Sequence, residues 1–185
     1  MKRIFVLPLL FVFISCSDKH KSTESVSINT PVGNIASNQT TSPAHPKVEK
    51  IHGEKLEYLQ SLSKLGPGFI TTYCPNEQST DLKAYDRAFH AWQTSNSPKH
   101  SKEQVTEILG GCLGNKLVSE LNMEWVLVTD KYGTDYAVRS NSYEVLAFPF
   151  STVLKRIEDN EYDFMNSVFI AVKHSIESGN YKPRK

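Results

Sequence analysis

The sequence MEWVLVTDKYGTDYAVR occupies residues 123–139. Strand-forming residues dominate 123–129, and the turn over 130–133 places Gly133 where a positive φ is needed. A return strand is predicted over 136–139, and 144–148 has the composition of a third strand. The stretch therefore predicts a three-stranded antiparallel meander.

Both faces of the first strand are apolar. Trp125 and Leu127 point one way, and Val126 and Val128 point the other way, because successive side chains of a strand alternate. Helices must cover one face of the sheet. The second face needs a cover too, either from the remaining helices or from a partner.

The chain on both sides of the meander has helical periodicity, and Ser101 and Gln104 have the spacing of a capping box. The expected helices are 48–65, ended by Gly66-Pro67-Gly68, then 81–92, 101–121, a short helix from 153, and one from about 160 to 176, ended by Gly179. The fold class is therefore α+β, a small three-stranded antiparallel meander packed with about four to five helices.

Gly110, Gly111 and Gly114 lie inside the helix expected over 101–121. Each costs about 1 kcal/mol relative to alanine in a helix interior. Close approach of another backbone onto the glycine face would offset that cost. A phosphate cradle is the alternative, but a cradle places its glycines in a loop that opens the helix.

The first residues have the layout of a secretory signal peptide: Lys2 and Arg3, an apolar run over 4–14, and a small residue at Ser15. The run is shorter than the roughly 20 apolar residues of a membrane-spanning helix. The sequence FISC over 13–16 resembles the bacterial lipoprotein box, in which the cysteine, here Cys16, becomes the lipidated first residue. Such an anchor, followed by a serine, implies the outer membrane facing the periplasm. Secretion after cleavage near Ser15 is the alternative.

Residues 17–46 are rich in Ser, Thr, Asn, Gln and Pro and contain no aromatic residue, so they cannot bury enough surface to fold. They form either a tether that lets a domain search near a membrane or a passive spacer. We expect three parts: a signal peptide over 1–15, a lipidated cysteine and disordered tether over 16–47, and a single globular domain over 48–185.

The composition argues against nucleic acid as a partner. The chain has 21 Lys and Arg against 20 Asp and Glu, so it has no basic excess to bind phosphates. Its 39% of hydrophobic residues is enough for a real core in a domain of this length.

Cys74 and Cys112 are the two cysteines that follow Cys16. In an oxidising periplasm they are a disulfide candidate, and such a bond would stabilise the fold by roughly 3 to 4 kcal/mol in the chain-entropy picture. The equal alternative is a buried thiol at Cys112 and a loop thiol at Cys74.

Motifs of catalysis and metal binding are incomplete. Ser61 and Lys64 have the S-x-x-K spacing of penicillin-interacting serine enzymes, but the S-D-N and K-T-G motifs are absent. No two of the six histidines have the H-x-x-x-H spacing of a helical zinc site. We therefore expect no catalytic residue, no metal and no cofactor.

The densest polar group near the turn comprises Asp130, Tyr132, Asp135 and Arg139. As structure, it is a hairpin turn with a cross-strand ion pair that also offers a binding surface, which is the interpretation we favour. As catalysis, it would be a pair of carboxylates with an arginine as electrostatic partner.

The motif W-V-x-V-x-D-x-Y-G-T-D over 125–135, followed by Phe148-Pro149 and by Val153-x-Lys155-Arg156, resembles an uncharacterised bacterial family, a domain of unknown function. The resemblance covers about residues 80 to 178. It implies a bacterial source and a compact domain, and it carries no activity and no catalytic residues.

The sequence as a whole favours a non-enzymatic protein-binding module, anchored to the membrane by lipid, that engages an envelope protein or neutralises a toxin as immunity lipoproteins do. The alternative is a small envelope hydrolase acting on cell-wall or related substrates.

Overall fold

The computed structural model describes residues 46–184. The expected signal peptide, Cys16 and all but the last two residues of the expected tether lie outside this range. Within it, one antiparallel sheet has the order β1-β2-β3-β4. Its strands are β1 Lys47–Lys50, β2 Met123–Asp130, β3 Gly133–Ser140 and β4 Leu146–Ala147.

The sheet has four strands, so the prediction of three was wrong. The additional strand, β1, lies where the start of a helix was expected, and it pairs with the edge of β2 in the register Val48 opposite Val128. Only one residue of β1 is apolar. Its extended form comes from hydrogen bonding to a strand some 80 residues later in the chain, which no local pattern encodes.

The described helices are α1 Glu54–Leu62, the 3₁₀ turn η1 Ser63–Leu65, α2 Gly66–Tyr73, α3 Leu82–Gln93, α4 Lys102–Leu121, α5 Pro149–Glu158 and α6 Met165–Glu177. The expectation that Gly66-Pro67-Gly68 ends a helix was wrong, because the segment starts α2 with the proline in its first turn, where a missing N–H costs nothing. Within 46–184, no helix is both long enough and apolar enough to span a bilayer.

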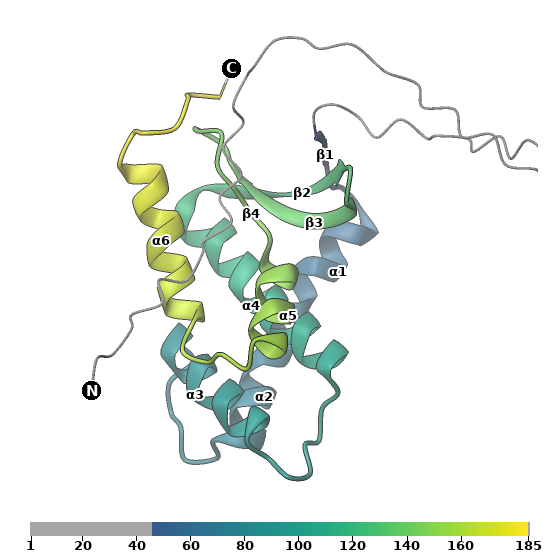
Figure 1. Cartoon of the computed structure of the whole chain (residues 1–185), viewed down its shortest axis with the longest axis vertical. Helices are drawn as coiled ribbons and strands as arrows, with labels where there is room; N and C mark the ends of the chain where they lie inside the picture. Colours follow the sequence, from purple (N-terminus) through teal and green to yellow (C-terminus); the bar gives the residue numbers. More distant parts are fainter. Residues whose placement is uncertain (1–45, 185) are drawn as a thin grey trace, which may run out of the picture.

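Helix α4 is the centre of the fold. It runs beneath β2 and β3 and packs against α1 and α5 (Figure 1). The predicted capping box is confirmed: the Ser101 hydroxyl accepts from the Gln104 amide, and the Gln104 side chain accepts from the Ser101 amide. The face of the sheet that carries Trp125 thus belongs to the main core.

The glycines of α4 accommodate side chains rather than a neighbouring backbone, which corrects the expectation. A Cβ on Gly110 would overlap the Phe150 ring, and one on Gly114 would overlap the Trp125 ring. The Phe150 ring of α5 and the Trp125 ring of β2 therefore pack directly against the backbone of α4. Their packing offsets the entropy that the glycines cost.

Helix α6 is held to α3 by one buried carboxylate. Asp86 on α3 accepts hydrogen bonds from the amides of Phe164, Met165 and Asn166 at 2.9, 2.8 and 3.3 Å. These are amides at the start of α6 that have no partner within the helix. Burial raises the pKa of Asp86, and the three N–H donors oppose that rise.

The C-terminal tail pairs with the segment that leads into β4. The Glu144 amide donates to the Lys182 carbonyl at 3.0 Å, and the Arg184 amide donates to the Ser142 carbonyl at 2.9 Å. A bridge between Tyr143 and Pro183 completes the contact. The tail therefore lies alongside residues 142–144, just before β4.

Candidate functional site

The β2–β3 turn has the predicted geometry. Gly133 has a φ of 133°, and Asp130 accepts from the Tyr132 amide at 2.7 Å, which closes the turn locally. The Tyr132 ring is 75% exposed at the tip, with the Lys131 amino group 4.8 Å from its centroid. The hairpin tip thus carries an exposed aromatic ring.

The second face of the sheet forms a small apolar cluster of its own. Val126, Val128 and Ala137 are buried there, and Val48, Leu146 and Phe148 pack against them. This cluster is separate from the main core, on the side of the sheet away from α4. The prediction that both faces of the first strand of the meander are apolar is therefore confirmed.

A cavity of about 500 Å³ opens beside this cluster, and we call it the first groove. Four elements line it: the hairpin from Asp130 to Asp135, the segment Val145–Phe148, one side of α5, and the inward side of α6 through Val168 and Val172. In Figure 1 these elements are the β2–β3 hairpin, β4, α5 and, on the left, α6. The groove therefore has an apolar floor and passes between parts of the chain far apart in sequence.

The predicted polar group is divided between two places. Asp130, Tyr132 and Asp135 line the first groove. Arg139 does not line it. Its guanidinium donates to Glu124 at 2.9 Å, directly across the β2–β3 ladder. The cross-strand ion pair of Arg139 is therefore with Glu124, which lies outside the predicted polar group.

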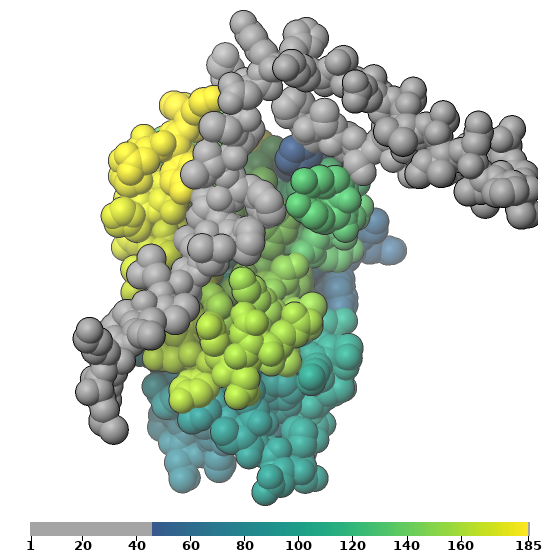
Figure 2. Space-filling view, in the orientation of Figure 1, coloured from purple at the N-terminus to yellow at the C-terminus, as the bar shows by residue number. Residues whose placement is uncertain are grey.

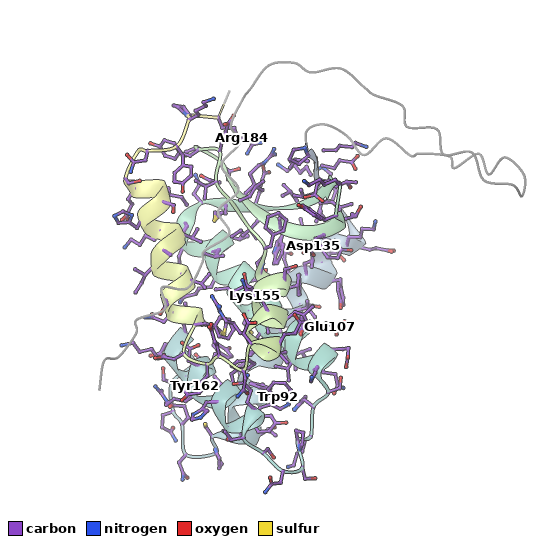
Figure 3. The ribbon with its side chains drawn as sticks, in the orientation of Figure 1. Trp92, Glu107, Asp135, Lys155, Tyr162 and Arg184 are labelled. Carbon is purple, nitrogen blue, oxygen red and sulfur yellow. The ribbon has the colours of Figure 1, made fainter. Side chains whose placement is uncertain are left out.

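Asp135 is bound to α5 through Ser151. The Ser151 hydroxyl donates to Asp135 at 2.5 Å, and the other carboxylate oxygen accepts from the Tyr136 amide at 2.7 Å. Lys155, one helical turn after Ser151, lines the same groove. Figure 3 shows Asp135 of β3 above Lys155 of α5.

Sequence reasoning missed Ser151 and Lys155. Their spacing of four residues places them on one face of a helix, and this was available from the sequence. Which face of α5 meets the hairpin was not available, since that depends on how α5 packs on α4.

Arg156, next to Lys155, is largely buried and forms an ion pair with Glu161 at 2.6 Å. Its Nε atom and the Gln93 Oε1 atom are both buried without a hydrogen-bond partner in the described chain. The groove floor near α5 therefore has a cation that is fixed in place by the loop after the helix.

Three cations surround the Glu124 carboxylate at the other end of the sheet. Lys50, Arg139 and Arg184 lie 2.9, 2.9 and 2.8 Å from its oxygens. Burial raises the pKa of Glu124, but the hydrogen bonds from Lys50, Arg184 and Arg139 outweigh it and lower the pKa to about 2. This carboxylate thus joins β1, β2, β3 and the C-terminal tail.

The described residues contain no disulfide, and Cys74 and Cys112 are both free. Cys112 is buried in α4, where its Sγ lies 3.9 Å from the Ser63 carbonyl oxygen, and burial raises its pKa to about 11. Cys74 is half-buried at the end of α2, and burial raises its pKa too. Of the two alternatives that the sequence left open, a disulfide or two free thiols, the structure therefore has the two free thiols.

The serine of the incomplete S-x-x-K motif makes a hydrogen bond within its own helix. Ser61 donates its hydroxyl proton to the Tyr58 carbonyl at 2.7 Å, one turn earlier in α1. Over 46–184, no group of three His, Cys, Asp or Glu side chains is close enough to hold a metal ion.

The comparison with protein families gives one match. A family model described as Domain of unknown function (DUF3806) matches residues 88–169, within the range of the sequence resemblance. The matched range runs from α3 into α6 and includes the hairpin and α5. No curated protein and no solved structure matches the chain.

Proposed function

We propose that the chain is a membrane-anchored lipoprotein of the bacterial envelope, facing the periplasm, that acts as a non-enzymatic protein-binding module. The observation that carries the proposal is the first groove. Val128, Leu146 and Phe148 of the second apolar face line it together with Val168 and Val172 of α6, and polar and charged side chains of the hairpin and α5 lie beside them. Such a combination is typical of binding sites.

The groove suits an extended segment of a partner protein. β4 is an edge strand, and the C-terminal tail occupies the edge only next to residues 142–144. Residues of an antiparallel pair alternate between those bonded to the partner strand and those that face away. The Ser140 amide donates to the Val145 carbonyl at 3.0 Å, so the backbone of Leu146, the next residue, faces away from β3. Main-chain bonds at Leu146 would give affinity, and the apolar floor would select side chains.

The proposed anchor places this groove within reach of membrane proteins. A tether of about 30 residues spans roughly 30 Å on average, which clears the lipid headgroups. An envelope protein is therefore the expected partner, and a toxin neutralised by an immunity protein is one form that partner could take.

The groove is tested by crosslinking from inside it. A photoreactive amino acid at Ser175, which lines the groove, should capture one envelope protein in cells, and the same group at exposed Ser97 should not. The captured protein is then purified and titrated against the full chain. Thr152→Arg, which fills the groove, should weaken binding at least about tenfold, an effect of about 1.4 kcal/mol.

Ser119→Arg is the matched control, because Ser119 is exposed on α4 and lines neither cavity. It adds the same charge and should leave binding unchanged. Equal affinity of the Thr152→Arg variant and the parent would show that the first groove is not the binding surface.

The anchor is tested separately. Cys16→Ser should release the protein from the membrane fraction, because the lipid is attached to that thiol. Continued co-sedimentation of the Cys16→Ser protein with outer membranes, with no other anchor found, would contradict the lipoprotein assignment.

A small envelope hydrolase is the second candidate, and the hydrogen bond between Ser151 and Asp135 is the observation that favours it. Ser151, Asp135 and Lys155 line one groove, so a hydroxyl, a carboxylate and an amine share the same space. If the full chain turns over peptidoglycan fragments and Ser151→Ala abolishes that turnover while the fold persists, the hydrolase replaces the binding module.

A further inference from the structure

We propose that a second groove, on the other side of α5, binds a cationic segment of a partner protein. This second groove is a cavity of about 610 Å³ between α1, the first turns of α4, β3 and α5. Asp135 lines both grooves and is the ridge between them. The space-filling view shows α5 at the surface below the hairpin (Figure 2).

The floor of the second groove is apolar and largely aromatic. It is formed by Tyr58, Tyr136, Phe150, Leu154 and Ile157. Tyr58 and Leu154 are 47% and 43% exposed, so both present apolar surface to water. The Phe150 and Tyr136 rings meet edge to face, with centroids 6.2 Å apart. A ligand that covers this floor would therefore bury apolar surface that water now contacts.

The rim of the second groove is acidic. Glu103, Glu107, Asp135 and Glu158 line it, against one amine, Lys102. Figure 3 shows Glu107 and Asp135 on the same side of the molecule beside α5, with Asp135 above Glu107.

Four carboxylates thus face one amine at this rim. None of the four belongs to the ion pairs made by Lys47, Lys50, Arg87, Lys116, Arg139, Arg156, Lys173 and Arg184. Burial raises the pKa of Tyr58, and the neighbouring Glu107 carboxylate, to which its hydroxyl is hydrogen-bonded, raises it further. Negative charge is thus concentrated here, although the whole chain is nearly neutral.

Charge and shape together select the occupant. A Lys or Arg side chain would lie against the Tyr58 or Phe150 ring and meet the Glu103 and Glu107 carboxylates, which combines a cation–π contact with ion pairing. Apolar neighbours of that side chain would cover Leu154. An acidic segment would face like charges at close range. The first groove has no such bias, since Asp130 and Asp135 lie there opposite Lys155 and Arg156.

The test uses the full-length chain in neutral detergent and a short fluorescent peptide of alternating Lys and Leu as the probe, with an alternating Glu and Leu peptide as its opposite. Fluorescence anisotropy should show binding of the first peptide and none of the second. The double variant Glu103→Gln with Glu107→Gln keeps the side-chain shapes and should weaken binding at least about fivefold.

The matched control is Glu144→Gln with Glu177→Gln, two exposed carboxylates outside both grooves. It removes the same charge and should change binding less than about twofold. Leu154→Asn removes floor without changing charge and should weaken binding, whereas it should not affect the partner of the first groove.

The proposal is overturned by any of three results: no binding of the Lys and Leu peptide, equal losses in the two double variants, which would mean attraction by net charge alone, or unchanged binding by Leu154→Asn. Binding of free spermidine at this groove without binding of the peptide would likewise overturn it, since the occupant would then be a small polyamine.

Discussion

The carboxylate of Glu124 is where the sheet is most sensitive to a single change. It receives Lys50 from β1, Arg139 from β3 and Arg184 from the tail. Glu124→Gln keeps the shape of the side chain and removes the charge. All three cations then lose their counter-ion at once, so β1 and the tail should both be held less firmly.

The size of the effect follows from the pKa. The pKa of Glu124 falls from the ordinary 4.5 to about 2, and at about 1.4 kcal/mol per pH unit this corresponds to about 3 kcal/mol. Lys50 is 59% exposed, so solvent screens its part, and we expect a loss of about 2 kcal/mol at pH 7. Because the folded-state pKa is lowered, this stability is present above about pH 4.5 and is lost as the pH falls toward 2.

Urea unfolding of the parent and of Glu124→Gln, measured at several pH values between 7 and about 3, provides the assay. The two free energies of unfolding should differ by about 2 kcal/mol at pH 7, and the difference should shrink as the pH falls below about 4.5, since protonated Glu124 resembles glutamine. Glu49→Gln is the control, because Glu49 is 49% exposed and pairs only with Lys47 among the described residues. A difference that stays constant with pH, or an equal loss in the control, would refute the role assigned to Glu124.

Three further predictions concern the core, the turn and the thiols. Gly114→Ala should lower the free energy of unfolding by about 1 to 3 kcal/mol, because the new methyl group would overlap the Trp125 ring, and an unchanged melting temperature would mean that the ring can move away. Gly133→Val should lower stability by about 1 to 3 kcal/mol through strain at a φ of 133°, and a parent-like thermal melt would contradict the turn geometry. In freshly isolated native protein, iodoacetamide should modify half-buried Cys74 well before buried Cys112, and mass spectrometry that finds the two peptides linked would show instead that a disulfide forms.

Part of the candidate site could be predicted from the sequence. The turn at Asp130 and Gly133, and the two apolar faces of the strand before it, were visible because each depends on neighbouring residues. The partners of Asp135 and Arg139 in the predicted polar group could not be predicted from the sequence. Arg139 pairs with Glu124, and Asp135 pairs with Ser151, at separations of 15 and 16 residues that depend on strand register and on the packing of α5.

The sequence by itself determined the local chemistry of this protein: the capping box at Ser101, the hairpin turn with Gly133, and the end of α6 near Gly179, whose φ is 66°. Each of these features depends on hydrogen bonds and dihedral preferences within about four residues. It therefore does not depend on where the segment packs in the fold. The tertiary structure alone decided that residues 47–50 form a strand, that the C-terminal tail pairs with residues 142–144, and that α5 stands between two grooves of different charge. The physical reason is that these features arise from contacts between segments distant in the chain, and such contacts have no signature in the order of neighbouring residues.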